Sequence, residues 1–150
     1  MSPSAIRLAY GFDQITNQGA GQFIGIVDAY DDPNIESDLG VFDSQFGLPT
    51  CTSSNGCFKK VYAQGSKPSA NAGWALEISL DVEWAHAIAP QAKIVLVEAA
   101  SNSFTNLMQA VDVAVQNKAL VFWRQRVFRR NFLRYSFRCE RRHLHGFLGR

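Results

Sequence analysis

Short apolar runs alternate with amphipathic segments along the chain, and the runs predict buried strands. Residues 23–27 (FIGIV) and 93–97 (KIVLV) form two such runs, and residues 119–121 (ALV) begin a third. Strands of a parallel sheet appear as continuous apolar runs because helices cover both of their faces. The first run ends at Asp28, and α/β proteins place their chemistry at the carboxyl ends of strands. Residues 58–62, inside a polar loop, are a candidate for one further short strand.

Three stretches with apolar residues at helical spacing predict helices over residues 33–46, 74–89 and 104–116. Asp31-Asp32-Pro33 would supply the N-cap and first turn of the first helix, and Pro90 would end the second. The predicted inward faces, in chain order, are Ile35, Leu39, Phe42 and Phe46; Ile78, Val82, Ala85 and Ala89; and Leu107, Met108, Val111 and Val115. The order strand, helix, helix, strand, helix, strand predicts an α/β fold in which helices cover both faces of a parallel sheet.

The composition excludes several classes of protein. The chain has 150 residues, of which 47% are apolar and 19% charged, so it is neither a disordered polyelectrolyte nor too short for a packed core. No run of 18 apolar residues is present to span a membrane. The first residues lack a basic segment followed by an apolar one, so we expect no secretory signal within this sequence.

Charge divides the chain near residue 121. Residues 1–120 carry six basic side chains against twelve carboxylates, whereas residues 121–150 carry nine arginines and no lysine against one glutamate. The overall net charge of +2 therefore conceals a −6 segment and a +8 segment. A change this abrupt predicts a boundary, with a folded part in residues 1–120 and an arginine-rich aromatic tail in residues 121–150.

Two of the three cysteines, Cys51 and Cys57, bracket the turn-rich loop TSSNG, and the third is Cys139. The pair either closes a small disulfide in an oxidising compartment or remains as two free thiols. No histidine or further cysteine lies near the pair in sequence, so the spacing predicts no zinc site.

Glu77 and Asp81 are the candidate catalytic residues. Their i,i+4 spacing places both carboxylates on one face of the second predicted helix, about one turn apart, where they repel each other. A solvated acidic face is one interpretation; an enclosed pair that shares a proton and transfers it in acid is the other. His86 is a further candidate base, but no serine or aspartate arrangement accompanies it, which favours a packing or surface role.

The sequence resembles the amino-terminal part of the catalytic domain of the sedolisins, the serine-carboxyl peptidases. The resemblance rests on GQFIGIVDAYDDPNIESDLGVFDSQFGLP and on the E-x-x-x-D of ALEISLDVEWAHAIAPQAKIVLVEA, and covers residues 5–118. It implies a subtilisin-like fold with a Ser-Glu-Asp triad and acid endopeptidase activity on polypeptides outside the cell. Glu77 resembles the family's general base, Asp81 its supporting acid, and Asp28 an additional acid of the proton relay in some members.

The remaining parts of the family pattern have no match in this chain. The family's nucleophile lies in a Gly-Thr-Ser segment, a further aspartate serves the oxyanion, and a calcium site follows; none of these is found here. The fold is therefore expected to be incomplete, and the 150-residue chain is expected to be inactive by itself. A subtilisin-type alternative using Asp28 and His86 lacks the H-G-T-H stretch and the serine.

Two interpretations of the tail remain. A shifted reading frame after about residue 118, from a two-base deletion or a one-base insertion near codons 119–123, accounts for the arginine excess, the absence of lysine and the loss of resemblance. Alternatively, nine arginines among aromatic residues act as a nucleic-acid-binding arm, with charge on phosphates and rings on bases. We favour the frameshift.

Overall fold

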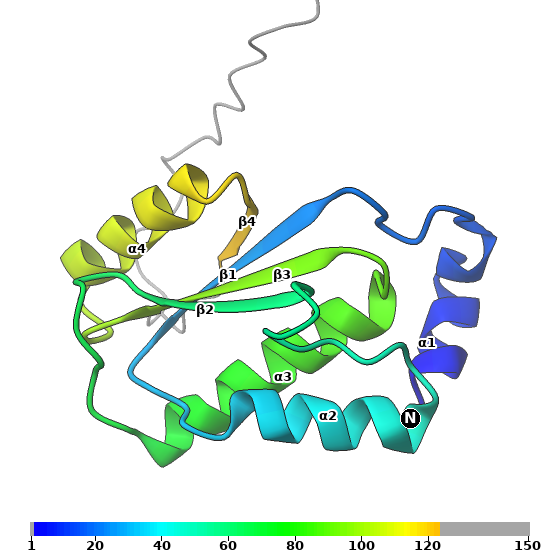
Figure 1. Cartoon of the computed structure of the whole chain (residues 1–150), viewed down its shortest axis with the longest axis horizontal. Helices are drawn as coiled ribbons and strands as arrows, with labels where there is room; N and C mark the ends of the chain where they lie inside the picture. Colours follow the sequence, from blue (N-terminus) through cyan, green and yellow to red (C-terminus); the bar gives the residue numbers. More distant parts are fainter. Residues whose placement is uncertain (1, 124–150) are drawn as a thin grey trace, which may run out of the picture.

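A parallel four-stranded sheet with strand order β2-β3-β1-β4 forms the centre of the molecule (Figure 1). The computed structural model describes residues 2–123 and, of these, the side chains of residues 2–119. The strands are β1 (Phe23–Ala29), β2 (Phe58–Tyr62), β3 (Lys93–Ala99) and β4 (Leu120–Trp123). The expected parallel α/β architecture is confirmed. β4 includes residue 121, near which the charge composition of the chain changes.

Helices cover both faces of this sheet. α2 (Ile35–Phe46) and α3 (Ala72–Ile88) lie on one face and α4 (Phe104–Gln116) on the other. Before β1, the chain forms the short helix α1 (Pro3–Ala9) and the 3-10 turn η1 (Phe12–Gln14). Among the described residues, no helix has the length and apolarity needed to cross a membrane.

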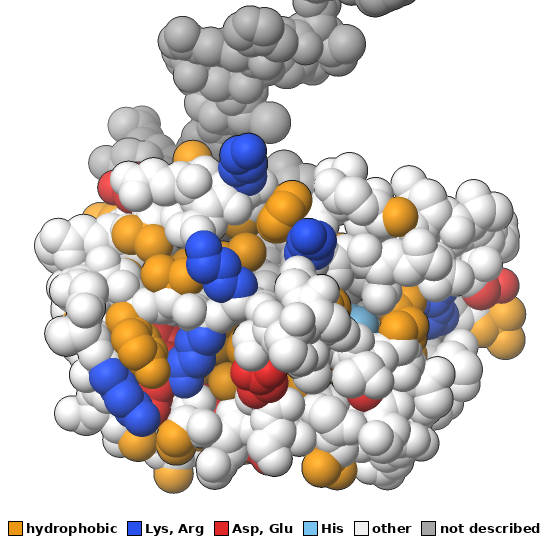
Figure 2. Space-filling model, viewed as in Figure 1, with side chains coloured by type: hydrophobic (Ala, Val, Ile, Leu, Met, Phe, Trp, Pro, Cys, Tyr) orange, Lys and Arg blue, Asp and Glu red, His pale blue; other side chains and the backbone are white. Residues whose placement is uncertain are grey.

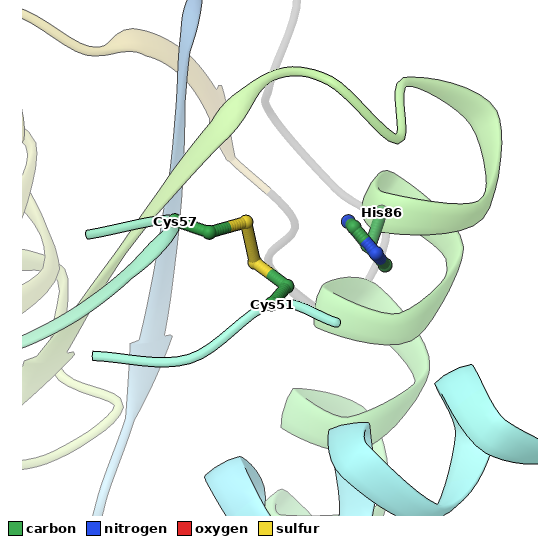
Figure 3. Close-up of side chains that lie close together, drawn as sticks. All are labelled: Cys51, Cys57 and His86. Atoms are coloured by element: carbon green, nitrogen blue, oxygen red, sulfur yellow. A yellow bond between two sulfur atoms is a disulfide. The ribbon is translucent and has the colours of Figure 1, made fainter. Parts of the chain in front are cut away.

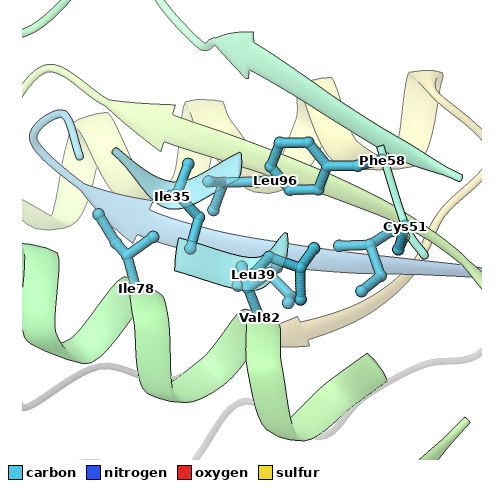
Figure 4. Close-up of a cluster of buried hydrophobic side chains, with 9 residues drawn as sticks. Ile35, Leu39, Cys51, Phe58, Ile78, Val82 and Leu96 are labelled. Atoms are coloured by element: carbon cyan, nitrogen blue, oxygen red, sulfur yellow. The ribbon is translucent and has the colours of Figure 1, made fainter. Parts of the chain in front are cut away.

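Alternate residues of each strand face opposite layers, which divides the core into two clusters. On the α2 and α3 side, the fully buried set is Ile26, Ile35, Leu39, Cys51, Phe58, Ile78, Val82, Ile94 and Leu96 (Figure 4). On the α4 side it is Val27, Ala29, Val95, Val97, Ala99, Leu107, Ala110 and Ala114. Both clusters include residues from β1 and β3, so these two strands are buried on both faces, as their continuous apolar runs predict.

The start of α2 differs from the prediction. The helix begins at Ile35 with Asn34 at its N-cap position, not at Pro33. Asp32 accepts a hydrogen bond from the Asn34 backbone N–H at 2.9 Å, in a turn that precedes the helix. Asp31 and Asp32 are buried in the sheet-end loop, so their carboxylates are used in tertiary contacts and do not cap the helix.

The predicted inward faces are only partly correct. On α4, Met108 and Val115 are 38% and 60% exposed, and Ala110 and Ala114 occupy the buried positions beside Leu107. The small alanine side chains allow the helix to approach the sheet closely. On α2 the buried face continues from Leu39 to Asp43, whereas Phe46 is exposed; on α3 it continues from Val82 to His86, with Ala85 and Ala89 only partly buried.

Candidate functional site

Two carboxylates lie side by side at the carboxyl end of the sheet. Asp28 of β1 is the register partner of Glu98 in β3, and both are fully buried. Two positions before each acid lies an apolar residue that faces α2 and α3: Ile26 before Asp28, and Leu96 before Glu98. Because side chains alternate along a strand, Asp28 and Glu98 are directed to that same face.

The loop after β1 brings further carboxylates to this end. Tyr30 adopts a left-handed backbone conformation, with φ of 65°, and its N–H donates to the Ala99 carbonyl at 2.8 Å. The turn places Asp31 and Asp32 inside the protein. The Asp32 N–H donates to Glu98 Oε1 at 3.0 Å, which ties this loop to the end of β3.

Lys60 of β2 neutralises part of this acidic region. Its Nζ lies 2.6 Å from Asp31 Oδ1 and 3.1 Å from Glu98 Oε2, and it donates to the Asp32 carbonyl at 2.6 Å. Lys67 Nζ approaches Asp31 Oδ2 at 3.2 Å from the surface. We call Asp31, Lys60 and Glu98 the acid–lysine cluster. Figure 2 shows Lys and Arg side chains scattered over one face of the molecule, with acidic side chains between them.

Burial and charge separate the two acids of this cluster. Burial raises the pKa of Glu98 to about 7, although the Asp32 N–H and Lys60 partly oppose the shift. Burial would raise the pKa of Asp31 too, but its interactions with Lys60, Glu98 and Lys67 outweigh burial and lower the pKa. In mild acid, therefore, Glu98 holds a proton, while Asp31 and Lys60 form a charged pair.

The raised pKa of Glu98 predicts how stability depends on pH. The pKa of Glu98 is 4.5 when unperturbed and about 7 in the folded chain, so between these pH values the folded chain binds the proton of Glu98 more tightly than the unfolded chain does. The free energy of unfolding is therefore expected to fall as pH rises through this window. Urea unfolding at pH 5 and pH 7.5 should show the decline, and Glu98→Gln should reduce it. Asp112→Asn, at an exposed site, is the control and should show the same decline in the free energy of unfolding as the parent chain. A decline in Glu98→Gln as large as in the parent chain would contradict this assignment.

The two carboxylates predicted from the helix spacing both belong to α3, the helix that packs on the sheet face to which Asp28 is directed. Glu77 and Asp81 are both half-buried in the middle of α3, one turn apart. Between them in sequence, Ser79 donates from its Oγ to Asp32 Oδ2 at 3.3 Å, which joins this part of α3 to the loop after β1. Both side chains are less exposed than the side chains of a fully solvated acidic face would be.

His86 lies elsewhere, on the carboxyl-terminal half of α3. It is fully buried, its Nε2 is 2.8 Å from the Pro49 carbonyl oxygen, and the same nitrogen is 3.3 Å from Asp43 Oδ1. Burial raises the pKa of Asp43, with partial opposition from His86 and the Cys51 N–H. These contacts fit the packing role predicted for His86. The structure also joins Cys51 to Cys57 by a disulfide.

Sequence reasoning missed the acid–lysine cluster. Glu98 directly follows an apolar run, as Asp28 does, and the parallel register of β1 and β3 brings the two acids together. In the sequence, Asp31 has the pattern of a helix cap, and Lys60 lies in the short strand β2, whose place in the sheet cannot be derived from local spacing.

Comparison with known proteins supports the fold. Neither protein-family models nor curated protein sequences give a match. Among solved structures, Pseudomonas sedolisin, a serine-carboxyl proteinase in complex with two molecules of pseudo-iodotyrostatin, superposes with a TM-score of 0.58 at 21% sequence identity. The match covers 72% of this chain and 30% of that chain, so this chain spans less than a third of the sedolisin structure. The chain therefore has a sedolisin-like fold.

Proposed function

We propose that residues 5–118 form the amino-terminal part of the catalytic domain of an acid-acting serine-carboxyl endopeptidase. The observation that carries the proposal is the position of Glu77 and Asp81 one turn apart on α3, beside the carboxyl end of a sheet with a sedolisin-like fold. In this proposal Glu77 is the general base, Asp81 orients and supports it, and Asp28 extends the proton relay behind them.

The chemistry of carboxylates supports operation in acid. A histidine base with its ordinary pKa would be protonated at pH 4 and unable to accept a proton. A carboxylate, with an ordinary pKa of about 4, still accepts one at that pH. Glu77 would take the proton of the serine nucleophile as its oxygen attacks the peptide carbonyl, and would return it to the leaving amine.

We do not infer a calcium site in residues 2–119, where the candidate donor group is two sulfurs and an imidazole, a soft set unsuited to Ca²⁺. No step is therefore assigned to calcium. We also infer a location outside the cell, which the Cys51–Cys57 disulfide supports because disulfides persist in oxidising compartments.

The sequence-based interpretations of the tail lie almost entirely outside the described residues. The arginine-rich segment 121–150 is described only as far as Trp123, as part of β4. The frameshift and the nucleic-acid-binding arm therefore both remain predictions, and the proposed peptidase function depends on neither.

A chimera tests the function. We expect the 150-residue chain to leave a denatured protein uncleaved at pH 3–5, because no Gly-Thr-Ser segment is present. Residues 5–118, placed in Pseudomonas sedolisin instead of the matching segment, should give a chimera that cleaves the same substrate at pH 4. A chimera with native-like circular dichroism and a cooperative thermal transition but no cleavage would contradict the proposal, as would turnover by the 150-residue chain itself.

A further inference from the structure

The disulfide lies beside a buried imidazole. Cys51 and Cys57 flank the loop before β2, and His86 comes from the end of α3, yet their candidate ligand atoms all lie within 4.8 Å of one another (Figure 3). Cys51 and His86 are fully buried and Cys57 is partly buried. Two sulfurs and an imidazole are the donor types that structural and catalytic zinc sites use.

The hydrogen bonds of His86 define which nitrogen is available to a metal. A carbonyl oxygen only accepts, so the 2.8 Å contact with the Pro49 carbonyl makes Nε2 a donor, and in the neutral tautomer that a metal would require the hydrogen lies on this nitrogen. Nδ1 is left with a lone pair, and it is buried without a hydrogen-bond partner. An unsatisfied buried acceptor costs free energy, which a bound cation would offset.

His86 has the kind of hydrogen-bond partners that metal-binding histidines have. Such a residue typically donates its second ring N–H to a backbone carbonyl or a carboxylate, which fixes the tautomer and the orientation of the ring. Here the Pro49 carbonyl accepts from Nε2, and Asp43 Oδ1 lies 3.3 Å from the same atom. Asp43 Oδ2 in turn accepts from the Cys51 N–H at 3.0 Å, so one carboxylate is linked to two of the three candidate ligands.

We propose that reduction of the disulfide opens a Zn²⁺ site formed by the sulfurs of Cys51 and Cys57 and by Nδ1 of His86. Zinc–sulfur bonds of about 2.3 Å in tetrahedral geometry place two thiolates roughly 3.8 Å apart, so the two sulfurs must separate from bonding distance, while the three donor atoms already lie within 4.8 Å of one another. Small movements of the two cysteine side chains therefore suffice once the S–S bond is broken. A water molecule takes the fourth position.

The surface offers a route to this site. Cys57 lines a hollow of about 450 Å³ together with Gly56 and Ile94. This hollow is the side from which we expect an ion, a water molecule or a small reductant to approach the partly buried Cys57. The fully buried Cys51 and His86 then complete the site from the interior.

The reaction balances with an external phosphine as reductant. Phosphorus gives two electrons to the S–S bond and takes the oxygen of one water molecule, becoming a phosphine oxide, and the two water protons go to the two sulfurs. Zn²⁺ then binds both sulfurs as thiolates and releases these two protons, while neutral His86 contributes its lone pair without losing a proton.

The test uses the full chain with its other soft donors removed by Cys139→Ser, His143→Ala and His145→Ala. The chain is reduced with a phosphine, freed of reductant under anaerobic conditions, and titrated with Co²⁺ and then Zn²⁺. We expect one Co²⁺ per chain, with sulfur-to-cobalt charge-transfer absorption that Zn²⁺ abolishes. The oxidised chain should give no such absorption. Loss of outer-shell partners weakens metal binding about 10–100-fold, so loss of the ligand in His86→Gln should weaken it by more than about 100-fold.

Controls make each outcome decisive. Glu83→Gln, on the same helix, should bind Co²⁺ as the parent chain does. If reduction unfolds the chain, Zn²⁺ should restore its helical circular dichroism, and His86→Gln should lose this recovery. Absence of charge-transfer absorption from the reduced chain, or equal affinity in His86→Gln and the parent chain, would overturn the proposal. These measurements involve no peptidase activity, so their outcome is independent of the proposed function.

Discussion

Lys60→Met is expected to lower the free energy of unfolding by about 3–5 kcal/mol at pH 7, because removal of one partner leaves buried charge uncompensated. Lys60 provides the cation for two fully buried carboxylates, at 2.6 Å from Asp31 and 3.1 Å from Glu98. Methionine retains most of the apolar stem, so the variant removes mainly the charge. Urea unfolding followed by circular dichroism measures the loss.

Lys59→Met is the matched control on the same strand. Lys59 is exposed and donates to Asn117 Oδ1 at 2.8 Å, so its removal should cost less than about 1 kcal/mol. The cost of Lys60→Met should also be smaller at pH 5 than at pH 7, since Glu98, with its pKa of about 7, then carries a proton. Equal losses in the two variants, or a larger Lys60→Met loss in acid, would contradict this description of the cluster.

In the sedolisin chimera, Glu77→Gln is expected to reduce kcat/KM at pH 4 by about 10²–10⁴-fold, the usual contribution of a general base. Glutamine retains the size and polarity of the side chain but cannot accept the serine proton. Steady-state cleavage of a peptide substrate, with protein concentration corrected for the folded fraction, measures the effect.

Glu83→Gln provides the same chemical change on the same helix. Glu83 is half-buried, and burial together with Asp38, Asp43 and Asp32 raises its pKa. It has no role in the proposed reaction, so kcat/KM should stay within about twofold of the parent chimera. Similar losses from Glu77→Gln and Glu83→Gln would show that the helix needs both acids for folding and would remove the catalytic assignment.

Local patterns in the sequence were sufficient to predict the main elements of the fold. β1 and β3 are apolar on both faces and therefore appear as continuous runs, and α4 occupies the predicted residues 104–116. The spacing of Glu77 and Asp81 predicts that both lie on one face of a helix, and the structure adds that this helix, α3, packs on the sheet face to which Asp28 is directed.

Features that depend on distant parts of the chain were harder to predict. Lys60, Asp31 and Glu98 come from three separate segments, and only the sheet order brings them together. His86 is 29 positions from Cys57, too far in sequence to indicate the donor group that the fold assembles. The sequence predicts a start of α2 at Pro33 because Asp31 and Asp32 resemble a cap, whereas in the structure tertiary contacts bury both carboxylates and the helix begins at Ile35.

The pH dependence of the chimera tests most directly whether a carboxylate on α3 is the catalytic base. With Glu77 as the base, kcat/KM at pH 4 should exceed kcat/KM at pH 7, and His86→Gln should leave this ratio unchanged. Activity that arises only above about pH 6 and disappears in His86→Gln would assign the base to histidine, because its ordinary pKa is about 6.5, and would contradict the account.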